Sequence, residues 1–260
     1  GFSMAETKLS AHTNEALFLR DKNLVEDVMG KMSFTDAMFY HIMGIAPSTG
    51  QRAILDAVLV TLMEHGFTPS AIAARMTYLS APEAMQSAVA AGLLSVASQF
   101  IGTMENAAKI LKEIANDPNG QNAACQRIVQ QHLDSGNHMP GFGHHLHRPD
   151  DPRTPKLFEI AMAHEEIDKR PIAMMQTLGQ YVDRNYGKHL TINATGATAA
   201  VLMGAAVPVR IMRGFAVISR AAGLVAHVME EQQNPAGRHI WDLVDNNIPY
   251  TGNALIKPAP

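Results

Sequence analysis

Apolar residues recur at helical spacing along most of this chain. Between Gln51 and Glu64 they fall at positions 54, 55, 58, 59 and 62, which places them on one face of an α-helix. About ten such segments alternate with turns that contain Gly, Pro or Asn, and none shows the residue-by-residue alternation of a half-buried strand. The pattern therefore predicts an all-α fold.

Capping and turn residues set the expected limits of these helices. The run Ser33-Phe34-Thr35-Asp36 is expected to provide the cap of one helix, Pro82 to occupy the first turn of another, and Gly66 to follow the end of a third. The predicted helical segments are residues 24–32, 37–40, 51–64, 69–79, 83–98, 102–114, 123–133, 154–167, 172–182, 190–206 (opening as a loop) and 208–233. Residues 4–22 are expected to form an extended arm, and the stretch from Arg238 to Gly252 a tail.

Composition narrows the classes of protein to which this chain can belong. It has 260 residues, 47% of them apolar but only 6% aromatic, so Ala, Leu and Met must fill the core of one large or two modest domains. The net charge of −3, without a basic run, predicts no nucleic-acid partner. Cys125 is the single cysteine, which excludes an intrachain disulfide and fits a cytoplasmic location. No run approaches ~18 continuous apolar residues, so no membrane partner is expected.

The densest chemistry lies between Pro140 and Arg153. These fourteen residues include two glycines, three histidines, two acids, two arginines and three prolines. Proline fixes φ and glycine admits unusual backbone shapes, so the stretch is predicted to be a fixed loop that aims imidazoles at a substrate. Only His145 and His147 are spaced to share one ion, and no cysteine assists. Acid–base chemistry is therefore favoured over a metal site, although a polar surface turn would show the same residues.

The loop resembles the central motif of citrate synthases and of the citryl-CoA lyase module of ATP-citrate lyase. The shared residues are the Gly-Phe-Gly-His run that ends at His144 and, nine residues later, Arg153 in Asp-Pro-Arg. The resemblance implies that His144 acts on the carbonyl oxygen of an oxo-acid and that Arg153 contacts the phosphates of coenzyme A. It also implies that coenzyme A lies against the backbone of Gly141, Phe142 and Gly143. The family fold implies a large helical domain, residues 4–101 and 205–260, hinged to a small helical domain, residues 102–204.

Two further matches concern catalysis. His65, in Glu-His-Gly, matches an active-site histidine, although a histidine at a helix C-terminus also interacts favourably with the helix dipole. Asn193 and Thr195 match an Asn-Val-Asp-Gly run whose aspartate exchanges the proton on the carbon that becomes the acetyl methyl group. Asn193 can orient a carbonyl or cap a helix, and Thr195 is not a general base near neutral pH. The candidates for a substitute carboxylate are Glu64, Glu105 and Asp150.

Three more positions separate branches of the family or concern the substrate. Citrate synthases have a catalytic histidine where this chain has Phe100, whereas the lyase module has Phe. Arg220, within an apolar helix, matches an arginine that grips a substrate carboxylate, although a structural carboxylate would also satisfy it. Arg238 resembles the arginine that reaches into the site of a neighbouring subunit, which implies a homodimer or a higher assembly.

Together these residues predict a citryl-CoA lyase-like enzyme. It would cleave citryl-CoA or a related β-hydroxyacyl-CoA thioester to an acyl-CoA and an oxo-acid, with coenzyme A present as part of the substrate and no metal. The alternatives are a CoA-thioester hydrolase or another acyl-CoA lyase on the same scaffold, and a CoA-thioester binding protein without catalysis.

Overall fold

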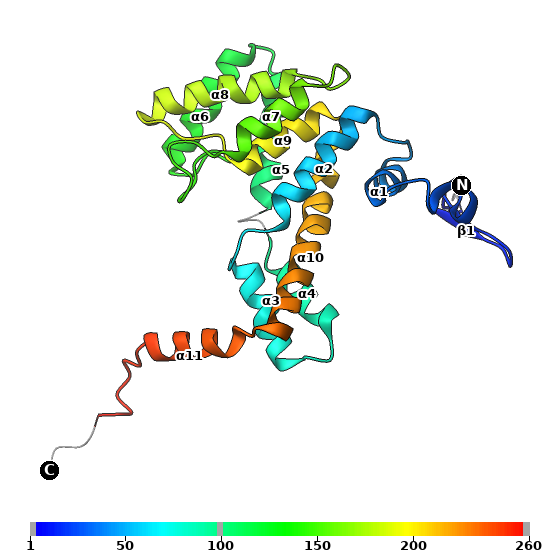
Figure 1. Ribbon diagram of the computed structural model, residues 1–260. Helices are drawn as coiled ribbons and strands as arrows, with labels where there is room; N and C mark the ends of the chain where they lie inside the picture. The colour runs from blue at the N-terminus through cyan, green and yellow to red at the C-terminus, as the bar shows by residue number, and fades with distance from the viewer. Residues whose placement is uncertain (1–3, 98–100, 257–260) are drawn as a thin grey trace. The chain divides into compact units, whose positions relative to one another are not determined.

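The computed structural model describes residues 4–97 and 101–256 (Figure 1). Its contacts divide the chain into two compact units. Unit 1 comprises Gly1–Thr61 and Phe100–Ala216, and unit 2 comprises Leu62–Gln99 and Val217–Pro260. The division at residues 102 and 204 that the family resemblance implies stays a prediction.

Helices dominate the described residues, which confirms the predicted all-α class. Three short strands pair antiparallel in the order β1 (Ser10–His12), β2 (Leu17–Leu19), β3 (Lys22–Asn23), and a π-helical turn η1 (Leu24–Val28) follows them. The α-helices are α1 (Phe34–Met43), α2 (Thr49–Met63), α3 (Pro69–Ser80), α4 (Met85–Leu94), α5 (Gly102–Asn116), α6 (Gln121–Ser135), α7 (Arg153–Met162), α8 (Arg170–Tyr186), α9 (Ala194–Gly204), α10 (Val209–Gln233) and α11 (Gly237–Asn247).

Several helix limits follow from local chemistry, and the cap of α1 lies in the predicted run that begins at Ser33. The Ser33 side chain accepts the N–H of Asp36 at 3.1 Å and so caps α1. Gly44 ends the same helix in the left-handed region, where a residue without Cβ is not strained. Thr68 caps α3 with Pro69 in its first turn.

Other predicted limits are wrong. Residues 24–32 form only the short η1, and the predicted helix 83–98 is restricted to α4 among the described residues. Pro82 lies in a turn, closed by the N–H of Ala84 on the carbonyl of Ala81, rather than at the helix start. Helix α7 ends at Met162, before the predicted Ile167, and the following residues turn so that Glu166 can accept the N–H of Gly50 at 2.6 Å.

Two features were not expected. Residues 4–22 include strands β1 and β2 rather than only an extended arm, because strands of three residues are too short to show an alternating pattern. The predicted tail contains helix α11, whose apolar positions were obscured by neighbouring charges and amides. Trp241 is one of its exposed apolar residues.

Helix α9 is the centre of unit 1. It packs against α5, α7 and α8 (Figure 1). Its side chains are small and Ala197, Ala199 and Ala200 are fully buried, so neighbouring helices approach closely. The N-terminus of α9 is therefore a rigid platform, and the His-rich loop lies on it.

Unit 2 contains α3, α4, α11 and the C-terminal part of α10. Helices α3 and α4 pack together, and α11 contacts α3. Helix α10 touches the end of α2 so closely that a Cβ on Gly223 would lie 2.0 Å from the carbonyl oxygen of Met63. The core of this unit is partly polar, because Arg75 and Glu231 are buried within it.

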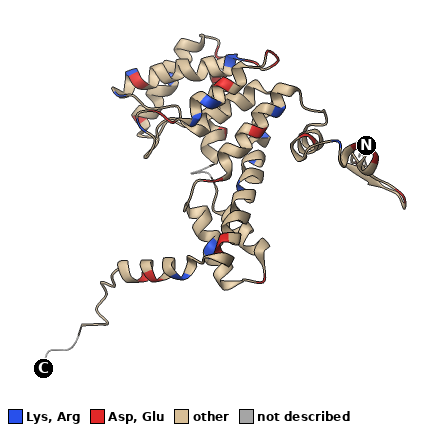
Figure 2. Ribbon diagram, viewed as in Figure 1, with Lys and Arg blue, Asp and Glu red and all other residues tan. Residues whose placement is uncertain are grey.

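Charge and hydropathy bear on the predicted partners. Basic and acidic residues are interspersed along the helices (Figure 2). Helix α10 is long and apolar enough to cross a membrane, with a mean hydropathy of 1.3 in its most apolar window, of which 44% is buried within the protein. Core helices of globular proteins have the same composition, and the absence of a membrane partner stays a prediction.

Candidate active site

The His-rich loop is anchored to the segment that leads into α9. Phe142 forms an antiparallel bridge with Ile192. The N–H of Gly143 donates to the carbonyl of Thr191 at 2.8 Å, and the N–H of Asn193 donates to the carbonyl of Gly141 at 2.9 Å. These bonds fix the backbone immediately before His144.

Two glycines make this anchoring possible. Gly141 has φ +90°, a conformation that L side chains rarely adopt. A Cβ on Gly196 in the first turn of α9 would lie 2.5 Å from the carbonyl oxygen of Gly141. The loop therefore rests directly on the backbone of α9.

Gly196→Ala is expected to push this loop away from α9. The added methyl group cannot fit at 2.5 Å from backbone, so we expect the free energy of unfolding to fall by about 1–3 kcal/mol and turnover to fall with it. Gly214→Ala in α10 is the matched control, because nothing lies within 4 Å of its Cβ position and helical Gly→Ala is neutral or stabilising. Urea unfolding of both variants tests this, and equal stabilities would contradict it.

Asp151 fastens the far end of the loop. Its side chain is fully buried and accepts hydrogen bonds from Nε and Nη2 of Arg153 at 2.9 and 2.8 Å and from the N–H of Ala194 at 3.0 Å. Burial alone would raise the pKa of Asp151, but the hydrogen bonds from Arg153 outweigh it and hold that pKa below its ordinary value. Arg153, expected to contact coenzyme A, thus binds Asp151, and its role towards coenzyme A stays a prediction.

The loop holds His144 in one tautomer. Its Nδ1 accepts the N–H groups of Leu146 and His147, both at 3.0 Å. An accepting Nδ1 carries no proton, so Nε2 of the neutral ring carries it and can donate to a substrate oxygen. Burial lowers the pKa of His144 below 6.5, and the charges of His147 and Arg153 lower it further. The ring is therefore neutral at neutral pH.

Asn193 and Thr195 lie beside this histidine loop at the N-terminus of α9. Asn193 Oδ1 accepts the N–H of Gly196 at 3.0 Å, which is the N-cap of the helix, and its Nδ2 donates to the carbonyl of Gly143 at 2.9 Å. The Thr195 hydroxyl donates to Asn193 Oδ1 at 2.7 Å. The amide of Asn193 thus joins the helix to the loop, and a direct part in catalysis stays a prediction.

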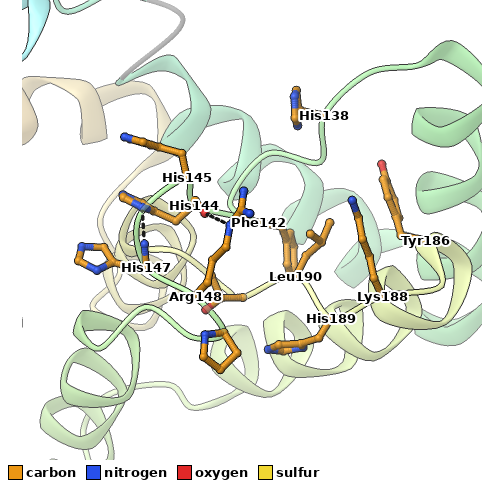
Figure 3. A pocket seen from close by; sticks show the side chains of 13 residues that line it. His138, Phe142, His144, His145, His147, Arg148, Tyr186, Lys188, His189 and Leu190 are labelled. Atoms are coloured by element: carbon orange, nitrogen blue, oxygen red, sulfur yellow. Dashed lines mark hydrogen bonds between the residues drawn. The ribbon is translucent and has the colours of Figure 1, made fainter.

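A pocket of about 700 Å³ opens next to the loop (Figure 3). The loop forms one wall, and the end of α8 with the following residues forms another. Cationic and imidazole side chains predominate in its lining, which consists of His138, Phe142, Gly143, His144, His145, His147, Arg148, Pro149, Tyr186, Lys188, His189, Leu190 and Thr191. The volume falls within the range of small-molecule sites, and the lining suits an anion.

His189 ties the two walls of the pocket together. Its Nδ1 lies 2.6 Å from Asp183 Oδ2, and its Nε2 lies 2.6 Å from Asp150 Oδ1. Both ring nitrogens can donate to carboxylates only when the imidazole is protonated. The hydrogen bonds to Asp183 and Asp150 raise the pKa of His189 above 6.5. Asp150, considered as a substitute base, is therefore engaged in this contact.

This contact predicts a pH dependence of stability. Because the folded-state pKa of His189 is raised above its unfolded value of 6.5, its contribution is fully present below 6.5 and is lost as pH rises through the folded-state pKa. We expect the free energy of unfolding, measured in urea between about pH 6 and 9, to fall more in the wild type than in His189→Gln. Parallel profiles for the two proteins would contradict this assignment.

The remaining predicted residues lie in unit 2. His65 follows the end of α2. Arg220 Nε donates to the carbonyl of Leu62 at 3.2 Å, and burial lowers the pKa of its guanidinium. Arg238 is exposed on α11, 3.3 Å from Asp242 and over the ring of Trp241.

Each proposed substitute carboxylate has a partner. Glu105 pairs with Arg213 in unit 1 at 3.2 Å, and Glu64 accepts from His227 in unit 2 at 2.8 Å. None of them is thereby identified as the missing base. Phe100, which separates the lyase module from the synthases, lies outside the described residues.

Sequence reasoning missed two residues of the pocket. Lys188 and His189 lie between the predicted helices 172–182 and 190–206 and were given no role. The polar run that directly follows a helix C-terminus was the available signal. Asp150, the partner of His189, is 39 positions away, so their contact depends on the tertiary fold.

Comparison with known proteins places the chain among citrate synthases and their relatives. The structure is similar to that of citryl-CoA lyase from Hydrogenobacter thermophilus, with a TM-score of 0.83 and 29% identity over 99% of this chain and 98% of that chain. It also has the fold of ATP citrate lyase from Methanothrix soehngenii, solved with citrate and coenzyme A, with a TM-score of 0.77 and 17% identity over 100% of this chain and 42% of that one.

Curated sequences and a family model agree with this. The 2-methylcitrate synthase of Shewanella oneidensis is 27% identical over 76% of this chain and 52% of its own length. The chain spans about half the length of the curated citrate synthases that it matches. The model for the citrate synthase C-terminal domain matches residues 8–241. The chain belongs to the citrate synthase family.

Proposed function

We propose that this protein is a citryl-CoA lyase-like enzyme. It cleaves the bond between Cα and Cβ of citryl-CoA, or of a related β-hydroxyacyl-CoA, and releases an acyl-CoA and an oxo-acid. The hydroxyl proton leaves, the C–O bond becomes a carbonyl, and the electrons of the broken C–C bond form the enolate of the acyl-CoA. A proton added to that carbon completes the product.

The observation that carries this proposal is the tautomer of His144. Two backbone N–H groups occupy Nδ1, so Nε2–H is aimed as a donor from a fixed loop. A preorganised donor stabilises the negative charge that develops on an oxygen during carbon–carbon cleavage better than water does. In this tautomer His144 binds the oxygen that becomes the carbonyl and leaves the hydroxyl proton to another group.

The pocket beside the loop is the proposed site for coenzyme A. Arg148 and Lys188 line it and provide cations for phosphates, while Gly143 provides backbone without a side chain. Phe142 is buried and secures the loop from beneath. Arg153 orders the same loop through Asp151 and lies outside the pocket lining, so its contribution to binding is proposed to be indirect.

Two observations support a lyase rather than a synthase. The structure is similar to that of citryl-CoA lyase, with 29% identity over 99% of this chain. Phe100 stands where synthases have a catalytic histidine, and a phenyl ring cannot donate a hydrogen bond to an enol oxygen.

Three residues of unit 2 have proposed roles that come from the family resemblance. His65 assists at the substrate, Arg220 holds a substrate carboxylate, and Arg238 serves the neighbouring subunit of a homodimer. Arginine suits these roles because its planar fork matches a carboxylate. We further propose a cytoplasmic enzyme that uses coenzyme A as part of its substrate and requires no metal.

Hydrolysis of the thioester is the second candidate. Thr195 favours it, because its hydroxyl already donates to Asn193 and cannot exchange the proton on the acetyl carbon. Without that exchange the same scaffold can direct water to the thioester. The remaining candidate functions are another acyl-CoA lyase activity and the binding of a CoA thioester without catalysis.

Incubation with citryl-CoA followed by mass spectrometry of the products tests the proposal. We expect acetyl-CoA and oxaloacetate. Free coenzyme A with citrate would identify a hydrolase instead. No turnover above the blank, with binding of citryl-CoA measured by calorimetry, would identify a binding protein, and other β-hydroxyacyl-CoA thioesters would then be tested in the same assay.

A further inference from the structure

A hydrogen-bonded network of polar side chains crosses the interior of unit 2. Arg75, with 1% of its surface exposed, donates from Nη1 to Glu231 Oε1 at 2.8 Å and from Nε to His227 Nδ1 at 2.9 Å. His227 Nε2 lies 2.8 Å from Glu64 Oε1. The network therefore runs from α3 through α10 to the residue that directly follows α2.

Arg75 fixes the tautomer of His227. A guanidinium is always a donor, so Nδ1 of His227 must accept and its Nε2 must carry the proton. That proton points at the carboxylate of Glu64, whose Oε1 lies 2.8 Å from Nε2. His227 is itself buried, which shields its ring from water.

The network ends at the backbone of His65. Glu64 Oε1 accepts the N–H of His65 at 3.0 Å and the N–H of Gly66 at 2.8 Å, in addition to His227. Burial would raise the pKa of Glu64, but the hydrogen bonds from His227 and Gly66 outweigh it and lower that pKa. Gly66 has φ +74°, so the turn is a tight one held by a single ionised oxygen.

The turn at Gly66 also covers the buried end of the network. The ring of Phe67 lies 4.7 Å from the guanidinium carbon of Arg75 and meets the ring of His227 edge-on at 6.0 Å. The turn and the network thus stabilise each other.

We propose that Arg75 and His227 are positioning residues for His65. Acting through the Glu64 carboxylate, they hold the backbone of His65 in place so that its imidazole meets the substrate at one position. This proposal rests on the proposed function, in which His65 assists at the substrate.

Two substitutions of His227 separate positioning from stability. His227→Asn places an amide oxygen near the Nδ1 position, so Arg75 keeps an acceptor while Glu64 loses its donor. His227→Gln places an amide near the Nε2 position, so Glu64 keeps a donor while Arg75 loses its acceptor. We expect kcat for citryl-CoA to fall about 10- to 100-fold in the Asn variant and to stay within about threefold in the Gln variant. We expect the Gln variant to be the less stable of the two in urea, since it leaves a buried arginine nitrogen unpaired.

A structural role would give a different pattern, in which activity follows stability. Glu64→Ala provides a variant that folds, because this side chain is 44% exposed. We expect it to match His227→Asn in kcat. In the His65→Ala background neither change should reduce kcat further, because residues that act through His65 are not additive with its loss. Additive losses would overturn the proposal.

Amide hydrogen exchange measures the contact between Glu64 and the backbone of His65 without an activity assay. We expect the N–H groups of His65 and Gly66 to exchange faster in His227→Asn and Glu64→Ala than in the wild type and in His227→Gln. Unchanged exchange would overturn the proposal even if citryl-CoA is cleaved. If the wild type cleaves no citryl-CoA, the proposed function fails, and the exchange rates still decide whether His227 positions His65.

Discussion

His144→Ala is expected to lower kcat for citryl-CoA cleavage by about 10²–10⁴-fold. The variant loses the Nε2–H donor that stabilises the oxygen of the forming carbonyl, and a single positioned donor or acid–base group contributes an effect of this size. Steady-state kinetics with citryl-CoA measures it. Because the donor acts mainly in the transition state, kcat should fall much more than KM changes.

Loss of the loop structure would also reduce activity, so His144→Asn serves as the companion variant. Its amide oxygen can accept the N–H groups of Leu146 and His147 that Nδ1 accepts now, which keeps the loop in place without the Nε2 donor. We expect a loss similar to that of the alanine variant. His132→Ala, on α6 and outside the pocket lining, controls for the removal of a histidine. Turnover within threefold of wild type in both His144 variants would show that the catalytic assignment is wrong.

Glu231→Ala is expected to lower the free energy of unfolding by about 3–5 kcal/mol. Removal of one partner from a buried ion pair leaves the other charge without compensation, and Arg75 is 1% exposed. The same carboxylate also accepts the N–H groups of Ala236 and Gly237 at 2.8 and 3.2 Å, at the start of α11. Equilibrium unfolding in urea measures the change, and near-ultraviolet circular dichroism reports the packing around Trp241.

The neighbouring acid is a matched control for Glu231. Glu230 also binds Arg75, through Nη2, but its side chain is 58% exposed, whereas that of Glu231 is 2% exposed. Exposed ion pairs contribute little, so Glu230→Ala should cost about 0–1 kcal/mol. Equal effects of the two substitutions would show that burial does not decide the strength of these contacts.

Much of the fold could be predicted from local sequence. Helical spacing identified α2, α5, α8 and α10, and the run of capping residues that begins at Ser33 marked the start of α1, because both signals depend on residues within one or two turns. The limits of α4 and α7 could not be predicted in this way. A turn at Ala81–Ala84 and a contact between Glu166 and Gly50 set them, and the second joins residues 116 positions apart.

The candidate site was predicted in part. The glycines and prolines around His144 indicated a fixed loop, and the structure shows that loop on the N-terminus of α9. Asn193 was expected either to orient a carbonyl or to cap a helix, and it does cap α9. The roles of His65, Arg220 and Arg238 in the proposed reaction stay predictions.

The sequence by itself determined most of the helical segments, the loop that is rigid and the residue types that stand on it. Only the tertiary structure decided the tautomer of His227, the burial of Asp151 and the protonated contact of His189 with two acids. The link from Arg75 to His227 likewise joins residues 152 positions apart. The physical reason is that periodicity and capping act through neighbouring residues, whereas the tautomer, burial and charge of a side chain depend on groups that only folding brings within hydrogen-bond distance.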